Sequence, residues 1–169
     1  MEAAKAASAH LYAIAVRGAL AYEGELRDPN KDGTPGATIL SGVRLLTVAD
    51  HTNPRDTLVS LLAALDAYAA EAAGTVAELI LYTNNKGYAQ TWALNHSLWA
   101  SVGSFVRRDN SPLANADLWA KILEHHKRMP IAFRFQGDDT TPEGVRMRVL
   151  KLRAKAEATK AANADGGQA

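Results

Sequence analysis

Two asparagines, Asn84 and Asn85, end a short apolar run that begins at Leu79. An apolar run of this length, ended by residues that favour turns, predicts a buried central strand. The following residues, Gly87 to Trp99, are typical of a helix. In open α/β sheets, binding and catalytic groups collect where a strand ends and a helix follows. Asn84 is therefore the first candidate for a functional position, although an amide is a poor acid, base or nucleophile.

A second segment, Asp28 to Gly33, has the spacing that opens a calcium-binding EF-hand loop. The glutamate that such a loop needs at its twelfth position is replaced by Ile39, and Pro29 interrupts the segment. We interpret the segment as a turn, because it is rich in Pro, Gly, Asn and Asp.

The five histidines do not have the spacing of metal ligands. His125 and His126 are adjacent on an expected helix, so their side chains diverge by about 100° and cannot share one metal ion. Cysteine is absent, which excludes disulfides and thiolate metal sites. The sequence contains no phosphate-binding glycine loop and no Ser or Cys nucleophile motif.

The elements that must position Asn84 follow a simple order. Three strands connected by turns form an antiparallel meander at the start of the chain. Helices and strands then alternate. This order predicts an α/β fold with a mixed five-stranded sheet flanked by helices. The expected strands are 10–17, 19–27, 38–48, 78–83 and 131–136. The expected helices begin at Thr52-Asn53-Pro54, Gly87, Asn115 and Pro142, and the last has Val145, Val149 and Leu152 on one face.

The chain has 169 residues, of which 47% are hydrophobic, and this suits one domain. We expect an N-terminal extension at 1–9, a domain at 10–162 and a disordered tail at 163–169. No secretory signal and no stretch of transmembrane length is visible, so we expect a cytoplasmic protein that does not enter the membrane.

The charge of the chain is uneven, although its net value is only +1. From Pro142 to the end there are six basic and three acidic residues, a net charge of +3, which leaves −2 for the rest. A basic terminal helix on a mildly acidic body favours a polyanionic partner.

Several local motifs together resemble the ribonuclease H family, which cuts the RNA strand of RNA–DNA hybrids. The most specific is SPLANADLWAKILEHH (111–126), in which a proline precedes Asn-x-Asp-Leu-Trp at a helix start. ELILYTNNKGY (78–88), Thr52-Asn53 before a helix, and FQGDDTTPEG (135–144) before the last helix match further family segments. The resemblance covers roughly residues 10–158 and implies the RNase H-like fold, an antiparallel meander followed by parallel strands.

That family hydrolyses phosphodiesters with two Mg²⁺ ions held by four acidic side chains, as two neighbouring dications require. The matching positions here carry Arg17, Thr57, Asn84 and, within a residue or so, Arg148, while Asp138 replaces the family's loop histidine. A guanidinium keeps its charge at cellular pH and would repel a dication. We therefore predict a pseudo-enzyme with no catalytic residue, no bound metal and no cofactor.

Our leading hypothesis is a catalytically inactive domain that binds nucleic acid, an RNA–DNA hybrid or duplex RNA, through the former substrate groove. Arg17 and Arg148 would either grip a phosphate there, or pair with Asp138 or Asp139 or point to solvent. For Thr52 and Asn53, helix capping is the alternative role. The candidate nucleic-acid-binding residues are Arg17, Thr52, Asn53, Asn84, Asn85, Lys86, Trp99, Arg107, Arg108 and Arg148.

Two other hypotheses remain open. The fold could serve as a protein-interaction or structural module, with a partner protein or as a homodimer. Alternatively, Asp56, Asp138, Asp139 and Glu143 could rebuild a displaced metal site, which would give a Mg²⁺-dependent ribonuclease H.

Overall fold

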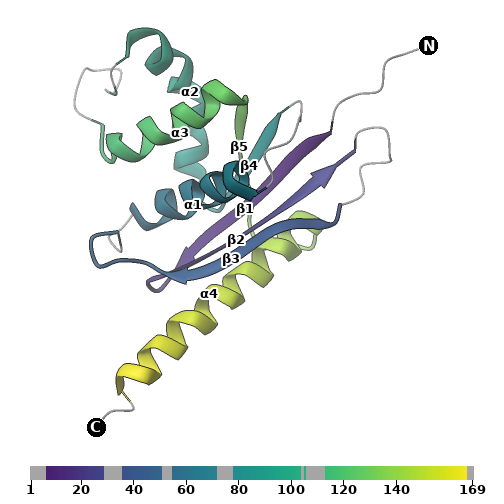
Figure 1. Ribbon diagram of the computed structural model, residues 1–169, viewed down its shortest axis with the longest axis vertical. Helices are drawn as coiled ribbons and strands as arrows, with labels where there is room; N and C mark the ends of the chain where they lie inside the picture. Colours follow the sequence, from purple (N-terminus) through teal and green to yellow (C-terminus); the bar gives the residue numbers. More distant parts are fainter. Residues whose placement is uncertain are drawn as a thin grey trace.

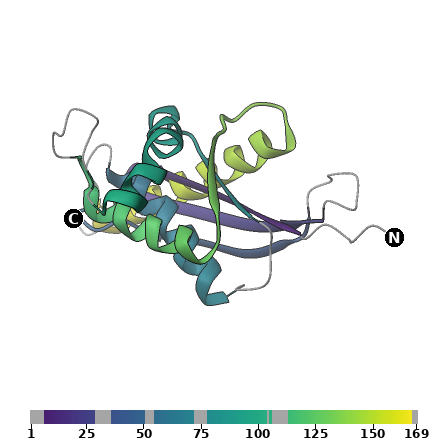
Figure 2. The ribbon, with the colours of Figure 1, turned by 90° about the horizontal axis from the view of Figure 1, so that it is seen from above.

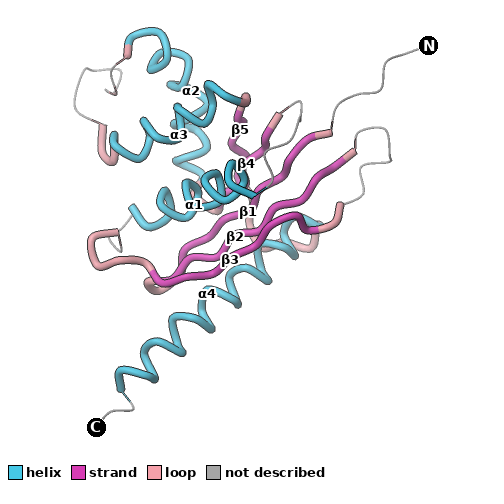
Figure 3. Tube along the Cα trace, viewed as in Figure 1, coloured by secondary structure: helices cyan, strands magenta, loops and turns pink. Residues whose placement is uncertain are grey.

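The computed structural model describes residues 7–28, 36–50, 55–71, 78–103, 105 and 113–166. Five strands and four helices follow one another in the expected order (Figures 1 and 3). The strands are β1 (Ser8–Val16), β2 (Ala19–Arg27), β3 (Thr38–Leu45), β4 (Leu79–Thr83) and β5 (Ile131–Phe135). The helices are α1 (Arg55–Glu71), α2 (Lys86–Val102), α3 (Ala116–Arg128) and α4 (Pro142–Gly166).

The strands form one mixed sheet in the order β3-β2-β1-β4-β5. The pairs β1–β2 and β2–β3 are antiparallel, while β1–β4 and β4–β5 are parallel. The fold class predicted from the sequence is thereby confirmed. Because β1, β4 and β5 are parallel, their carboxyl ends meet at one edge of the sheet, which we call the C-edge.

The alternation of side chains along the strands divides the core between the two faces of the sheet. Leu11, Leu81 and Ile131 point to the face covered by α1, and the tryptophans of α2 and α3 join this larger core. Tyr12 and Tyr82 point to the opposite face, where α4 covers them (Figure 2). No helix within the described residues is long and apolar enough to cross a membrane.

Several expected boundaries differ from the structure. β1 begins at Ser8, inside the segment assigned to the N-terminal extension, and β3 ends at Leu45 instead of residue 48. α4 begins at Pro142 as predicted, but it continues to Gly166, so residues 163–166 are helical and do not belong to a disordered tail. The predicted start of α1 at Thr52-Asn53-Pro54 lies outside the described residues.

Asn115 does not cap α3 with its side chain, as its type had suggested. Its backbone is left-handed (φ 60°) and makes no side-chain cap hydrogen bond. Its side-chain oxygen instead accepts a hydrogen bond from Arg55 at 3.3 Å, and Arg55 also pairs with Asp117 at 2.7 Å. The side chain therefore links α3 to α1, and the helix start is held by an inter-helix ion pair.

Candidate functional site

Asn84 lies at the C-edge, one residue beyond the end of β4, and its side chain is exposed. The backbone N–H of Gln136 donates to the carbonyl of Thr83 at 2.8 Å, which keeps the chain after β5 beside Asn84. A small cavity of about 90 Å³ opens here. Its lining residues come from β1, the end of β4, the loop after β5 and α4. They are Ile14, Asn84, Gln136, Gly137, Asp138, Met147 and Lys151.

The strand register shows which residue of β1 lies beside Asn84. Tyr12 pairs with Tyr82 across β1 and β4, so two residues further along Ile14 is level with Asn84. Arg17 lies three residues beyond Ile14, about 10 Å along an extended chain. Ile14, and not Arg17, therefore lies level with Asn84 and lines the cavity with it.

The residues around this cavity do not fit a pair of Mg²⁺ ions. Hard dications need several anionic or carbonyl oxygens within coordination distance. The lining includes one carboxylate, that of Asp138, and the neutral amides of Asn84 and Gln136, together with two apolar side chains and the ammonium group of Lys151. One negative charge beside a cation is too little to hold two dications. Ile14 and Met147 are 3% and 1% exposed, so each contributes a buried hydrocarbon surface where a ligand oxygen would be needed.

The four carboxylates proposed for a displaced metal site take part in other interactions, and one of them, Asp138, lies 4.0 Å from the Lys151 ammonium nitrogen. Asp56 accepts from the backbone N–H of Thr57 at 2.8 Å, at the start of α1. Asp139 accepts from the hydroxyl of Thr141 and, at 3.0 Å, from its backbone N–H, and these two hydrogen bonds lower the pKa of Asp139. Glu143 pairs with Arg27 at 2.8 Å. Within the described ranges, no group of three or more His, Asp or Glu side chains could hold a metal ion.

Arg17 and Gly18 form the tight turn between β1 and β2. Val16 pairs with Ala19, and both turn residues have positive φ, 52° for Arg17 and 86° for Gly18, as a type I′ hairpin turn requires. Arginine is an unusual choice for a left-handed position, where asparagine or glycine is preferred. The turn exposes the arginine side chain near the C-edge.

The two residues after Asn84 have different roles. Asn85 is the N-cap of α2, and its side-chain oxygen accepts from the backbone N–H of Tyr88 at 3.0 Å. The Lys86 side chain is exposed at the first residue of the helix. Asn85 therefore has a structural function that is sufficient to explain it, whereas Asn84 makes no hydrogen bond to any other described residue.

Arg148 lies on the exposed side of α4 and donates a hydrogen bond to the backbone carbonyl of Asp138 at 2.9 Å. The ammonium nitrogen of Lys151 is 4.0 Å from the Asp138 carboxylate. These contacts tie the loop after β5 to α4. Pairing of Arg148 with this loop, one of the two alternatives from the sequence, is present through the backbone of Asp138.

The remaining sequence-predicted site residues are either buried or outside the described part of the chain. Trp99 is 1% exposed and packs against Phe105, with ring centroids 5.4 Å apart, and against Trp92 and Trp119. Its ring therefore supports the core and is not available to stack on a base in this structure. Thr52, Asn53, Arg107 and Arg108 fall outside the described residues.

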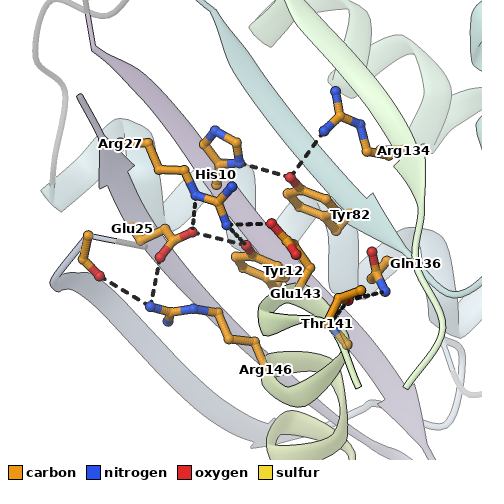
Figure 4. A network of polar contacts seen from close by, with 12 residues as sticks. His10, Tyr12, Glu25, Arg27, Tyr82, Arg134, Gln136, Thr141, Glu143 and Arg146 are labelled. Atoms are coloured by element: carbon orange, nitrogen blue, oxygen red, sulfur yellow. Dashed lines mark hydrogen bonds and ion pairs between the residues drawn. The ribbon is translucent and has the colours of Figure 1, made fainter. Parts of the chain in front are cut away.

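Sequence reasoning missed a polar network between the sheet and α4 (Figure 4). Glu25 is fully buried and pairs with Arg27 at 2.8 Å and with Arg146 at 2.7 Å. The Tyr12 hydroxyl donates to Glu25 at 3.0 Å, and Arg27 reaches Glu143 at the start of α4. The sequence signal was the alternation of ionisable residues in β2, Glu23, Glu25 and Arg27, which places all three on one face of the strand.

His10 extends this network towards β4. Its Nδ1 lies 2.9 Å from the Tyr82 hydroxyl, and its ring is 5% exposed. Burial, together with the nearby cations Arg27 and Arg134, lowers the pKa of His10 from its usual 6.5 to about 4. Burial and the neighbouring Glu25 carboxylate raise the pKa of Tyr12, so its phenol stays protonated and acts as a hydrogen-bond donor. The network thus fixes α4 on the sheet.

Comparison with known proteins identifies the fold and leaves the family open. No protein-family model and no curated protein sequence matches the chain. Solved structures do match: the RNase H domain of prototype foamy virus has a TM-score of 0.59 at 16% identity, covering 94% of this chain and 92% of that one. LC11-RNase H1, solved in complex with an RNA/DNA hybrid, has a TM-score of 0.54 at 14% identity, covering 90% and 99%.

The foamy viral protease–reverse transcriptase in complex with an RNA/DNA hybrid has a TM-score of 0.64 at 17% identity. The alignment covers 91% of this chain but only 20% of that longer protein. The chain therefore has the RNase H fold, with the same mixed five-stranded sheet and flanking helices, at identities that show the fold alone.

Proposed function

We propose that this RNase H-fold domain is not a nuclease and binds nucleic acid, an RNA–DNA hybrid or duplex RNA, along the C-edge of its sheet. The single observation that carries the proposal is the cavity beside Asn84. Its lining combines the hydrocarbon side chains Ile14 and Met147, the Lys151 ammonium group and one carboxylate with the amides of Asn84 and Gln136. Such a set repels dications and tolerates a phosphate group.

Four cations lie near the C-edge on three elements, and one of them, Lys151, lines the cavity. Arg17 is exposed in the β1–β2 turn, Lys86 begins α2, and Arg148 and Lys151 lie on α4. Cations on a shared edge are the usual source of affinity for a nucleic-acid backbone, because each phosphate contact releases condensed counterions. The exposed amide of Asn84 adds a donor and an acceptor in their midst.

The structural neighbours add support of a general kind. The foamy viral protease–reverse transcriptase and LC11-RNase H1 were each solved in complex with an RNA/DNA hybrid. A hybrid or duplex RNA is therefore the natural first ligand to test. In this proposal Thr52, Asn53, Arg107 and Arg108 complete the nucleic-acid-binding set, and Trp99 supports it from the core.

Binding should be measured with a labelled hybrid, a duplex RNA and a duplex DNA of equal length, at several salt concentrations. We expect the affinity to fall steeply with salt and to be higher for the hybrid or the duplex RNA than for the duplex DNA. Lys151→Gln and Arg148→Gln should each weaken binding and reduce the salt dependence. Absence of binding at low salt would refute the proposal.

Arg128→Gln is the matched control for these two variants. Arg128 is exposed at the opposite edge of the sheet, next to a cavity lined by Leu79 and Ile131, where β4 and β5 begin. The substitution removes the same charge from the protein but not from the C-edge. If Arg128→Gln and Arg148→Gln reduced the nucleic-acid affinity equally, binding would depend on net charge alone, and the C-edge would not be the binding surface.

A further inference from the structure

α4 has two apolar faces, and only one of them is covered by the sheet. Met147, Leu150 and Ala154 are at most 1% exposed and pack on β1 and β2. Val145, Val149 and Leu152 are 45%, 44% and 60% exposed. With about 100° of rotation per residue, the exposed set points about 180° away from the buried set. The sequence had grouped Val145, Val149 and Leu152 on one face, and the structure places that face outward.

The exposed residues have the spacing of a coiled-coil seam. The intervals Val145–Val149–Leu152 are four and three residues, and the exposed Ala156 continues the pattern by four more. Apolar residues at alternating intervals of four and three form the stripe that inserts between the side chains of a facing helix. We call Val145, Val149, Leu152 and Ala156 the outer seam of α4.

Among the charged residues of α4 that the structure describes, the four nearest the outer seam are cations, and one of them, Arg153, lies 4.0 Å from the Glu23 carboxylate. Arg148 and Lys155 lie on one side of it, and Arg153 and Lys160 lie on the other, each within about a quarter of a turn. The two carboxylates between residues 142 and 164, Glu143 and Glu157, are further round towards the sheet. In the described part of the chain, neither Lys155 nor Lys160 forms an ion pair.

We propose that the outer seam is a docking surface for an acidic amphipathic helix of another protein. Such a helix would cover the valines and the leucine with its own apolar stripe and place carboxylates opposite the flanking cations. Charge complementarity selects this occupant. A second copy of the chain would bring the cations of both helices to the same seam, where like charges repel.

Two other polyanionic surfaces fit the seam less well. A nucleic-acid backbone would satisfy the cations but would leave Val149 and Leu152 without an apolar partner. An anionic membrane favours helices with large aromatic or leucine-rich faces, whereas this seam is narrow and consists of two valines, one leucine and one alanine. The outer seam and the C-edge share Arg148, but Val149, Leu152, Lys155 and Lys160 are not part of the nucleic-acid-binding set, so the two proposals can be tested separately.

The test uses designed helical peptides of about three heptads. The first has leucine at the seam positions and glutamate at the flanking positions. The second keeps the leucines and carries lysine at the flanks, and the third keeps the glutamates and carries serine at the seam. We expect the protein to bind the first peptide with micromolar affinity and the other two at least about tenfold more weakly.

Variants of the protein locate the binding surface. Val149→Ser with Leu152→Ser, and separately Lys155→Glu with Lys160→Glu, should each weaken the first peptide at least about tenfold. Both pairs change side chains on the outward face of α4, so the fold should be retained. Leu94→Ser is the control, because Leu94 is 63% exposed on α2, and it should leave peptide binding unchanged.

Four outcomes would overturn the proposal. The first peptide could fail to bind at low salt. The serine-seam peptide could bind equally well, which would show that binding depends on charge alone. The protein could bind vesicles of anionic phospholipid more tightly than it binds the first peptide, and the Leu152→Ser variant could lose this vesicle binding. Sedimentation could reveal a dimer that Val149→Ser and Leu152→Ser abolish. Each measurement is made without nucleic acid, so failure here leaves the proposed function standing, and the converse also holds.

Discussion

Arg17 is the residue at which stability and binding are expected to conflict. A left-handed backbone costs a residue other than glycine or asparagine free energy, and such strain is often retained at functional positions. The Arg17→Asn substitution creates an Asn-Gly turn, the pair that this hairpin type prefers. We expect the free energy of unfolding to rise by about 0.5–1 kcal/mol, while the affinity for a hybrid falls.

Chemical denaturation and hybrid binding, measured on the same Arg17→Asn preparation, test this expectation. The neighbouring substitution Gly18→Ala serves as a contrast, because it adds a side chain at φ 86° and should lower stability without removing a charge. If Arg17→Asn stabilised the protein and left binding unchanged, Arg17 would have no part in the nucleic-acid interface.

The buried His10 predicts how stability depends on pH. Its pKa is about 4 in the folded protein and 6.5 in an unfolded chain. Above pH 6.5 both states are neutral, but between pH 6.5 and 4 the unfolded chain binds a proton that the folded protein does not. Folding stability should therefore fall as the pH decreases through this window, by at most about 3 kcal/mol from this residue.

Urea denaturation of the wild type and of His10→Asn, at pH 7 and at pH 4.5, isolates the contribution of His10. The variant should be less stable at pH 7, because it loses part of the contact with Tyr82, but it should lose less stability on acidification. Equal acid-induced losses in the two proteins would show that the pKa of His10 is not depressed.

At the scale of elements, α4 is held to the sheet by buried charges as well as by apolar packing. Glu25 accepts from Tyr12 and pairs with two arginines. Removing one partner of a buried ion pair leaves the other charges uncompensated, which costs about 3–5 kcal/mol. We expect Glu25→Gln to lower the free energy of unfolding by about 3 kcal/mol.

Glu124→Gln is the matched control for Glu25→Gln in the same denaturation experiment. Glu124 pairs with Lys127 on the surface of α3, where both side chains are more than half exposed. Exposed pairs contribute about 0–1 kcal/mol, so this variant should be close to the wild type. Similar losses from the two substitutions would mean that the buried network does not anchor α4.

Element order was predictable because its signals are local. The apolar run before Asn84, the proline at 142 and the turn formers around residue 30 each mark a boundary without help from the rest of the chain. The role of the Asn115 side chain and the buried face of α4 were harder to predict. The first depends on Arg55 and the second on the sheet, and both are distant in the sequence. An ion pair across helices leaves no local pattern.

At the scale of the whole molecule, the candidate site was only partly predictable. The position of Asn84 at the C-edge follows from strand order alone. Ile14, Met147 and Lys151 were not predicted, because their meeting depends on the register between β1 and β4 and on the depth at which α4 packs. The absence of a two-metal site stays a prediction, which the cleavage experiment below tests.

A labelled RNA–DNA hybrid tests directly whether the domain binds nucleic acid without cutting it. The hybrid is incubated with the protein in EDTA, in Mg²⁺ and in Mn²⁺ at equal ionic strength. The bound fraction and the length of the RNA strand are measured in the same samples. We expect the same affinity in all three solutions and an intact RNA strand throughout, since the cavity beside Asn84 is lined by Lys151 and two hydrocarbon side chains. Metal-dependent cleavage that Asp138→Asn abolishes, or binding that EDTA removes, would contradict it.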